Sequence, residues 1–123
     1  MFDNSSLTPF SVKVLNTLLY HQRRVRKPRV TADDVPPRML SYGDLCEMLD
    51  REKRHAICLC EPLARIEEWC VANDRPNLSA LVVSEATRRP GECYGRSPQF
   101  SRDSWEQDIL DCLGTINYPL HIC

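Results

Sequence analysis

The sequence has 123 residues, 42% of them hydrophobic, which is the size and composition of one compact domain with a single core. The 16 Lys and Arg against 17 Asp and Glu give a formal net charge of −1, so bulk charge does not favour a nucleic-acid partner, and binding of a polyanion requires cations clustered on one face. No secretory signal opens the chain, and no apolar run approaches the roughly 18 residues of a membrane span. We therefore expect a cytoplasmic protein with no membrane partner, whose seven cysteines are reduced.

The first predicted element is a helix over about residues 9–24. Thr8 and Pro9 provide an N-cap and a proline in the first turn, and apolar residues follow at helical spacing. The helix ends in a basic run that starts at His21 and carries five closely spaced cations: Arg23, Arg24, Arg26, Lys27 and Arg29. Such a run suits the negative end of the helix dipole as a solvated cap, and it also suits a patch that binds phosphate or acidic groups. Both interpretations stay open.

The next stretch predicts a loop followed by a short helix. Residues 30–40 contain two aspartates and two prolines with scattered apolar side chains, which is typical of a loop. Ser41 is a predicted N-cap that forms a capping box with Asp44, and the helix is expected over about Tyr42–Leu49. Residues 50–54 have no apolar side chain and are the predicted turn of a helix-turn-helix.

A third helix is expected over about His55–Val71, and Pro62 within it either kinks the helix or marks a second start. Three basic residues stand at its expected N-terminus, where the helix dipole favours a phosphate: Lys53, Arg54 and His55. Further along, the positive charge of Arg65 is outweighed by three carboxylates, those of Glu61, Glu67 and Glu68. Carboxylates oppose entry into a phosphate-lined groove, so we expect phosphate contacts rather than base reading from this helix.

The C-terminal third predicts a hairpin, a helix and a tail. Residues 78–84 have strong β-propensity, residues 87–91 form the expected turn, and residues 92–94 are the expected return strand. Arg88 and Arg89 would then project from the tip, either as phosphate or minor-groove contacts or as solvated side chains. A last helix starts near residue 103 with Gly114 as its C-cap, and an extended tail over residues 116–123 covers the core.

The predicted fold class is α+β, mainly α: a winged helix-turn-helix of three helices, a two-stranded wing and a C-terminal helix, in one domain over residues 1–123. The predicted core consists of nine large side chains at helical or strand spacing. They are Leu45, Leu49, Leu63, Ile66, Trp69, Leu81, Val83, Trp105 and Ile109.

Three motifs carry a resemblance to known proteins. They are Tyr42-Gly43-Asp44-Leu45, Pro76-x-Leu78-x-x-Leu81-Val82-Val83, and Arg89-Pro90-Gly91-x-x-Tyr94. This pattern resembles that of small uncharacterised bacterial and prophage winged-helix proteins. More distantly, the order is similar to the winged-helix DNA-binding domain of the alkyltransferase-like proteins, which also open with Tyr-Gly and end with a glycine turn before an aromatic residue.

The resemblance implies a helix and a wing that face DNA, with contacts from Lys53, Arg54, His55, Arg65, Arg88 and Arg89. It implies no catalysis. Active alkyltransferases carry a nucleophilic cysteine in a Pro-Cys-His-Arg motif, whereas this chain has Pro76-Asn77-Leu78-Ser79 at that point.

Cysteine and histidine spacing does not predict a metal site or another cofactor. Cys58 and Cys60 are two residues apart, so they point to nearly opposite sides of a helix and do not easily share a tetrahedral ion. The three histidines lie in different segments without a nucleophile motif beside them. We expect the thiols to be buried as small hydrophobic groups.

Three functional classes follow, and an enzyme ranks last because no nucleophile motif stands beside the histidines. The first is a non-enzymatic nucleic-acid-binding protein that contacts mainly the phosphate backbone of DNA, or another polyanion, through the three basic clusters. The alternative is a small phage or mobile-element protein that binds and modulates a larger host protein or nucleoprotein complex through a mixed or acidic face.

Overall fold

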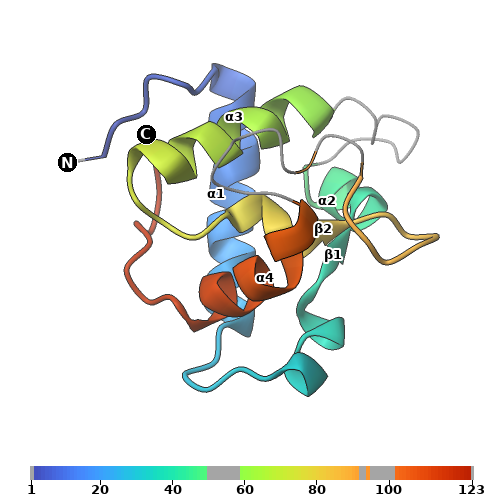
Figure 1. The fold of residues 1–123 in the computed structure, drawn as a ribbon. Helices are drawn as coiled ribbons and strands as arrows, with labels where there is room; N and C mark the ends of the chain where they lie inside the picture. Colours follow the sequence, from blue (N-terminus) through green and yellow to red (C-terminus); the bar gives the residue numbers. More distant parts are fainter. Residues whose placement is uncertain (1, 50–58, 92–93, 95–101, 123) are drawn as a thin grey trace.

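A computed structural model describes residues 2–49, 59–91, 94 and 102–122. The described part is mainly helical, with α-helices α1 (Pro9–Val25), α2 (Tyr42–Met48), α3 (Cys60–Ala72) and α4 (Trp105–Gly114). Two short strands, β1 (Leu40–Ser41) and β2 (Val82–Val83), form the one sheet among these residues. The class is therefore α+β, mainly α. Figure 1 shows α1 passing behind α3 and α4, with the sheet and α2 at one side.

The starts of α1 and α2 confirm the capping predictions. The Thr8 hydroxyl accepts a hydrogen bond from the Ser11 N–H at 3.2 Å, and the Thr8 N–H donates to the Ser11 hydroxyl at 2.6 Å. Ser41 and Asp44 make the same reciprocal pair, at 2.9 and 3.3 Å. Each pair satisfies two backbone donors that a helix N-terminus leaves open, which fixes where each helix begins.

The third helix begins later than residue 55 in its described part. α3 starts at Cys60, so Pro62 lies in its first turn and marks a start rather than a kink. A first-turn proline removes an N–H that has no partner within the helix, and its presence there costs little. The predicted turn and the predicted helix start, residues 50–58, lie outside the described residues.

The predicted strand over residues 78–84 is mostly wrong. Leu78–Leu81 form a 3₁₀ helix, η4, and only Val82–Val83 are extended. The Asn77 side chain accepts hydrogen bonds from the Ser79 N–H at 3.1 Å and the Ser79 hydroxyl at 2.7 Å, which turns the chain locally. All four residues of η4 are buried, and η4 contacts α1, α3 and α4. Burial on every side overrides the β-propensity of this segment.

The sheet also differs from the predicted wing. β1 pairs with β2 in parallel, with Leu40 opposite Val82 and Ser41 opposite Val83. A parallel pair needs a crossover connection, and here the chain between the strands includes α2 and α3. The predicted return strand falls on residues 92–94, of which only Tyr94, in a turn, is described. A turn precedes it over residues 84–89, earlier than the predicted 87–91, and the Ser84 N–H donates to the Arg89 carbonyl there at 2.8 Å.

Residues 30–40, predicted as a loop, contain two further 3₁₀ turns, η1 (Ala32–Asp34) and η2 (Pro36–Arg38), before β1. At the other end of the chain, Gly114 is the last residue of α4 and Thr115 is the C-cap, one residue later than predicted. The described tail, residues 116–122, forms neither helix nor strand and bends at Tyr118 and Leu120, and its Ile122 is buried.

All nine predicted core residues are buried, and they belong to one hydrophobic cluster. Trp69 lies at its centre without solvent exposure and stacks against Phe2, with ring centroids 5.6 Å apart. The Trp69 indole N–H donates to the Asn4 side-chain oxygen at 2.8 Å. These contacts fasten the N-terminal segment across α3.

Three of the described cysteines, Cys46, Cys70 and Cys112, are free and buried, as predicted. Cys60 is disulfide-bonded, so the prediction of reduced thiols is wrong at this residue. Its partner lies outside the described residues, as does Cys58 of the Cys58-x-Cys60 pair.

Candidate nucleic-acid interface

The basic run at the end of α1 forms an exposed positive end of the molecule. Arg24, Arg26 and Arg29 are all exposed. Arg26 is the C-cap, with an extended backbone, and its N–H still donates to the Gln22 carbonyl at 2.8 Å. The side chains that follow therefore leave the helix axis at its negative end, where cations are favoured.

Lys27 and Arg38 hold the segment that follows α1. The Lys27 ammonium lies 2.8 Å from an Asp34 carboxylate oxygen. Arg38 donates to the carbonyls of Val25 at 2.8 Å and Asp34 at 2.6 Å. The hydrogen bond from Lys27, together with one from the Thr31 N–H, lowers the pKa of Asp34 to about 2. These bonds hold the loop that bears Arg29 against α1. The Asp34 carboxylate offsets the positive charge of Lys27.

The two remaining ionisable residues of the run have structural partners. Arg23 donates to the Leu120 carbonyl at 2.7 Å and ties the C-terminal tail to α1. His21 is buried, and its Nε2 lies 2.8 Å from the Arg38 carbonyl oxygen. Burial lowers the pKa of His21 below its usual value. Hence His21, which the sequence places in the basic run, does not belong to the exposed surface.

Charge is concentrated in this part of the chain. Residues 21–38 contain six Lys and Arg and two Asp, a net charge of +4, in a chain with a net charge of −1. Arg38 is the cation that sequence reasoning missed, because a loop beyond two prolines gave no sign that it folds back onto α1. The segment is thus a positive pole in a chain whose other residues sum to a net charge of −5.

Arg65 is placed differently. Its guanidinium bonds the Glu61 carboxylate through Nε and Nη2, at 3.1 and 2.9 Å, and donates to the Ser6 carbonyl at 3.1 Å. Glu61 and Glu68 are exposed on the same helix. The described outer face of α3 therefore presents carboxylates, with its arginine engaged in an ion pair.

Arg88 and Arg89 stand on the exposed turn between β2 and Pro90. Arg88 has a φ of 56°, which the tight turn imposes. The Arg89 guanidinium lies 5.6 Å from the centre of the Trp105 ring, a cation–π distance. In Figure 1 this turn projects at the right, whereas the loop after α1 lies at the bottom, so the structure does not bring the two clusters together. Lys53, Arg54 and His55 lie outside the described residues.

Among the described residues, none of the helices has the length and apolar character needed to cross a membrane. Nor does this part of the chain contain three His, Cys, Asp or Glu side chains grouped so that they could hold a metal ion. Comparison of the chain with protein-family models, with curated proteins and with solved structures gave no match.

Proposed function

We propose that this protein is a non-enzymatic binding module that contacts the phosphate backbone of a nucleic acid, most simply DNA, through the positive pole at the end of α1. The observation that carries the proposal is the net charge of +4 on residues 21–38, with Arg24, Arg26 and Arg29 exposed. A nucleic acid that binds such a cluster releases the counterions condensed on its phosphates, and this release favours binding. A neutral partner has no condensed counterions to release.

The proposed contacts are to phosphates rather than to bases. A helix that reads the major groove needs donors on its outer face, and the described outer face of α3 carries Glu61 and Glu68, with Arg65 paired. Arg88 and Arg89 serve in this proposal as a secondary contact, because they lie on a separate projection. Sequence discrimination should accordingly be weak.

The winged-helix assignment and the relationship to small prophage proteins belong to this proposal as well. α2 and α3 supply two helices in the required order, and the turn at residues 84–89 supplies a basic projection. A cytoplasmic setting, where nucleic acid is accessible, accompanies the same hypothesis.

Binding of a fluorescent duplex of unrelated sequence, measured by anisotropy from about 50 mM salt upwards, tests the proposal. We expect the double variant Arg26→Gln/Arg29→Gln to bind roughly tenfold or more weakly at low salt and to lower the salt slope by about 2, since each lost phosphate contact removes about 0.9. Arg88→Gln/Arg89→Gln removes the same charge and should have a smaller effect. Lys13→Gln, on another face of α1, should bind like the parent.

Two results would refute the proposal. One is the absence of any nucleic-acid binding at about 50 mM salt, the lowest concentration of the series, where screening of the phosphate contacts is weakest. The other is a double variant at Arg26 and Arg29 that binds as tightly as the parent while remaining folded by circular dichroism.

A further inference from the structure

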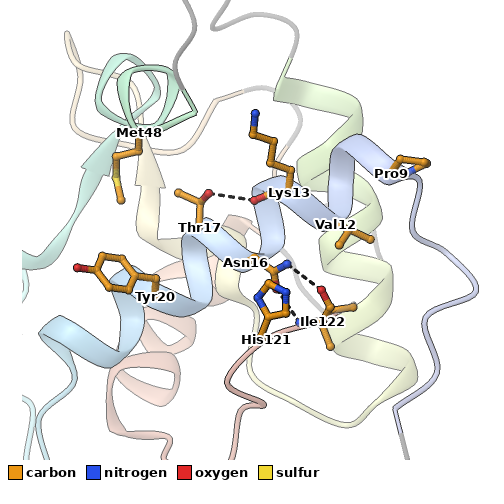
Figure 2. Close-up of a pocket in the computed structure, with 9 residues that line it drawn as sticks. All are labelled: Pro9, Val12, Lys13, Asn16, Thr17, Tyr20, Met48, His121 and Ile122. Carbon is orange, nitrogen blue, oxygen red and sulfur yellow. Dashed lines mark hydrogen bonds between the residues drawn. The ribbon is translucent and has the colours of Figure 1, made fainter.

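The face of α1 that points away from the core forms one side of an open groove of about 720 Å³. Figure 2 shows Met48 on one side of α1 and His121 with Ile122 on the other. A second hollow of about 520 Å³ shares Val12 and Ile122 with it, so the groove extends towards the N-terminal segment. This face was not singled out by the sequence, because the helix stripe that lines it mixes apolar and polar residues.

Two of the large apolar side chains that line the groove are well exposed. Tyr20 is 50% exposed and Met48 40%, and both line the groove. Clustered apolar side chains on one concave surface are typical of a binding site, whereas apolar side chains scattered singly are not.

The wall formed by the tail is fixed rather than loosely draped. The Asn16 side-chain amide donates to the Ile122 carbonyl at 2.8 Å and accepts from the Ile122 N–H at 2.7 Å. Arg23 adds the bond to the Leu120 carbonyl at 2.7 Å. A groove with a wall held this way is preorganised, so a ligand does not have to order it on binding.

The formal charge on the described residues that line the groove is positive. Lys13 lines it and is exposed, and the Arg24 guanidinium lies 5.6 Å from the centre of the Tyr20 ring at its far end. No Asp or Glu is among the described residues that line this groove. A ligand that places carboxylates near Lys13 and Arg24 is therefore complementary to it, and a basic ligand is not.

The length of the groove suits a helix. From Pro9 to Tyr20, at about 1.5 Å per residue, α1 extends about 16 Å, or roughly three helical turns. Helices that dock in grooves present apolar side chains at positions i, i+3 or i+4, and i+7, which span about 10.5 Å and so fit within this length.

We propose that this groove binds an amphipathic α-helix of a partner protein, with apolar side chains on the face that meets Tyr20 and Met48 and acidic side chains flanking that face. The groove lining includes neither Arg26 nor Arg29, and only Arg24, at its far end, is shared with the proposed phosphate contacts, so the protein can join a nucleic acid to a protein.

The test is a selection from a displayed library of helical peptides, each of about fourteen residues, against the whole protein, followed by anisotropy titrations with the selected peptides. We expect the recovered peptides to have an apolar stripe at helical spacing and a net negative charge. Tyr20→Ser should weaken their binding roughly tenfold or more, because a buried aromatic ring is the usual anchor of such a contact. Lys13→Glu should weaken it similarly, whereas Ile116→Ser, which removes an apolar side chain 77% exposed outside the groove, should not.

Several outcomes would overturn the proposal: recovery of no binder, binders that are basic or extended, or binding to Tyr20→Ser as tight as to the parent. Sedimentation of the protein alone provides a further test. If the parent is a dimer and Tyr20→Ser is a monomer, the groove binds a second copy of this chain, and the proposal is overturned. Tyr20→Ser should leave nucleic-acid binding unchanged, so this proposal and the one on phosphate contacts fail separately.

Discussion

The hydroxyl of Tyr42, at the first residue of α2, accepts a hydrogen bond from the backbone N–H of Gly91 at 2.8 Å. The Tyr-Gly and Pro-Gly motifs, almost fifty residues apart in the chain, therefore meet in space. A Cβ atom added at Gly91 would collide with the Tyr42 hydroxyl oxygen and lie 3.1 Å from its ring carbon Cζ. Glycine is needed at this position because of the close approach of the tyrosine, and not because of its backbone conformation.

We predict that Gly91→Ala destabilises the protein by about 1–3 kcal/mol, since the tyrosine must shift and lose its bond to the backbone. Tyr42→Phe should cost about 0.5–1.5 kcal/mol, and in that background Gly91→Ala should cost less. Gly114→Ala is the matched control, because a Cβ there meets nothing within 4 Å. At the end of α4 that change should be neutral or stabilising, by up to about 1 kcal/mol. Denaturant unfolding of the four variants measures the coupling, and additive costs would show that the two motifs do not interact.

The parts of the fold that depend on local signals could be predicted from the sequence. Caps at Thr8 and Ser41 mark helix starts, and helical spacing identified the buried residues of α2, α3 and α4. The pairing of Leu40 with Val82 could not be predicted, because it joins strands of two residues across a connection of some forty residues. Likewise, the turn at Leu78–Leu81 depends on being enclosed by three helices, which no local pattern reveals.

The candidate site divides in the same way. The sequence identified the cations of this segment except Arg38, and it could not say which of them are engaged in hydrogen bonds or ion pairs. Arg65 is bound by the Ser6 carbonyl and Arg23 by the Leu120 carbonyl, and both partners are distant in the chain. The groove could not be predicted for a related reason, because Met48 and Ile122 come next to α1 only in the folded protein.

The ion pair between Lys27 and Asp34 predicts a specific pH dependence. The pKa of Asp34 in the folded protein is lowered to about 2 from 3.8, so its contribution to stability is complete above about pH 4 and is lost as the pH falls towards 2. Lys27→Met should raise the pKa of Asp34, although not fully to 3.8, because the Thr31 N–H still donates to the carboxylate at 2.9 Å. NMR titration of the side-chain carboxyl carbon measures the shift. Arg24→Gln is the control, and an Asp34 pKa that is unmoved in Lys27→Met would mean that the ion pair does not form.

The three free cysteines should be inert in the folded protein. Burial raises the pKa of Cys112 to about 12 and also raises the pKa of Cys70, so the reactive thiolate is scarce at neutral pH. We expect iodoacetamide to leave Cys46, Cys70 and Cys112 unmodified in the native state and to modify all three in guanidinium, as read by peptide mass spectrometry. Fast alkylation of Cys70 at neutral pH in the native state would contradict the buried placement.

The end of α3 offers a stabilising substitution. Asp74 has a φ of 53°, and the chain closes the helix there with hydrogen bonds from the Asp74 N–H to the Val71 carbonyl at 3.2 Å and from the Arg75 N–H to the Cys70 carbonyl at 2.9 Å. This pair of bonds is the Schellman arrangement, in which glycine is the preferred residue at the left-handed position. A side chain at positive φ costs about 1–2 kcal/mol, and glycine avoids this cost. The net gain is smaller, because glycine has more freedom in the unfolded chain and loses more entropy on folding. We predict that Asp74→Gly stabilises the protein by about 0.5–1 kcal/mol and raises Tm by a few degrees. Asp74→Ala separates the two causes, because it removes the carboxylate and keeps the strain. If Asp74→Ala raised Tm as much as Asp74→Gly, the gain would come from the lost charge and not from the backbone.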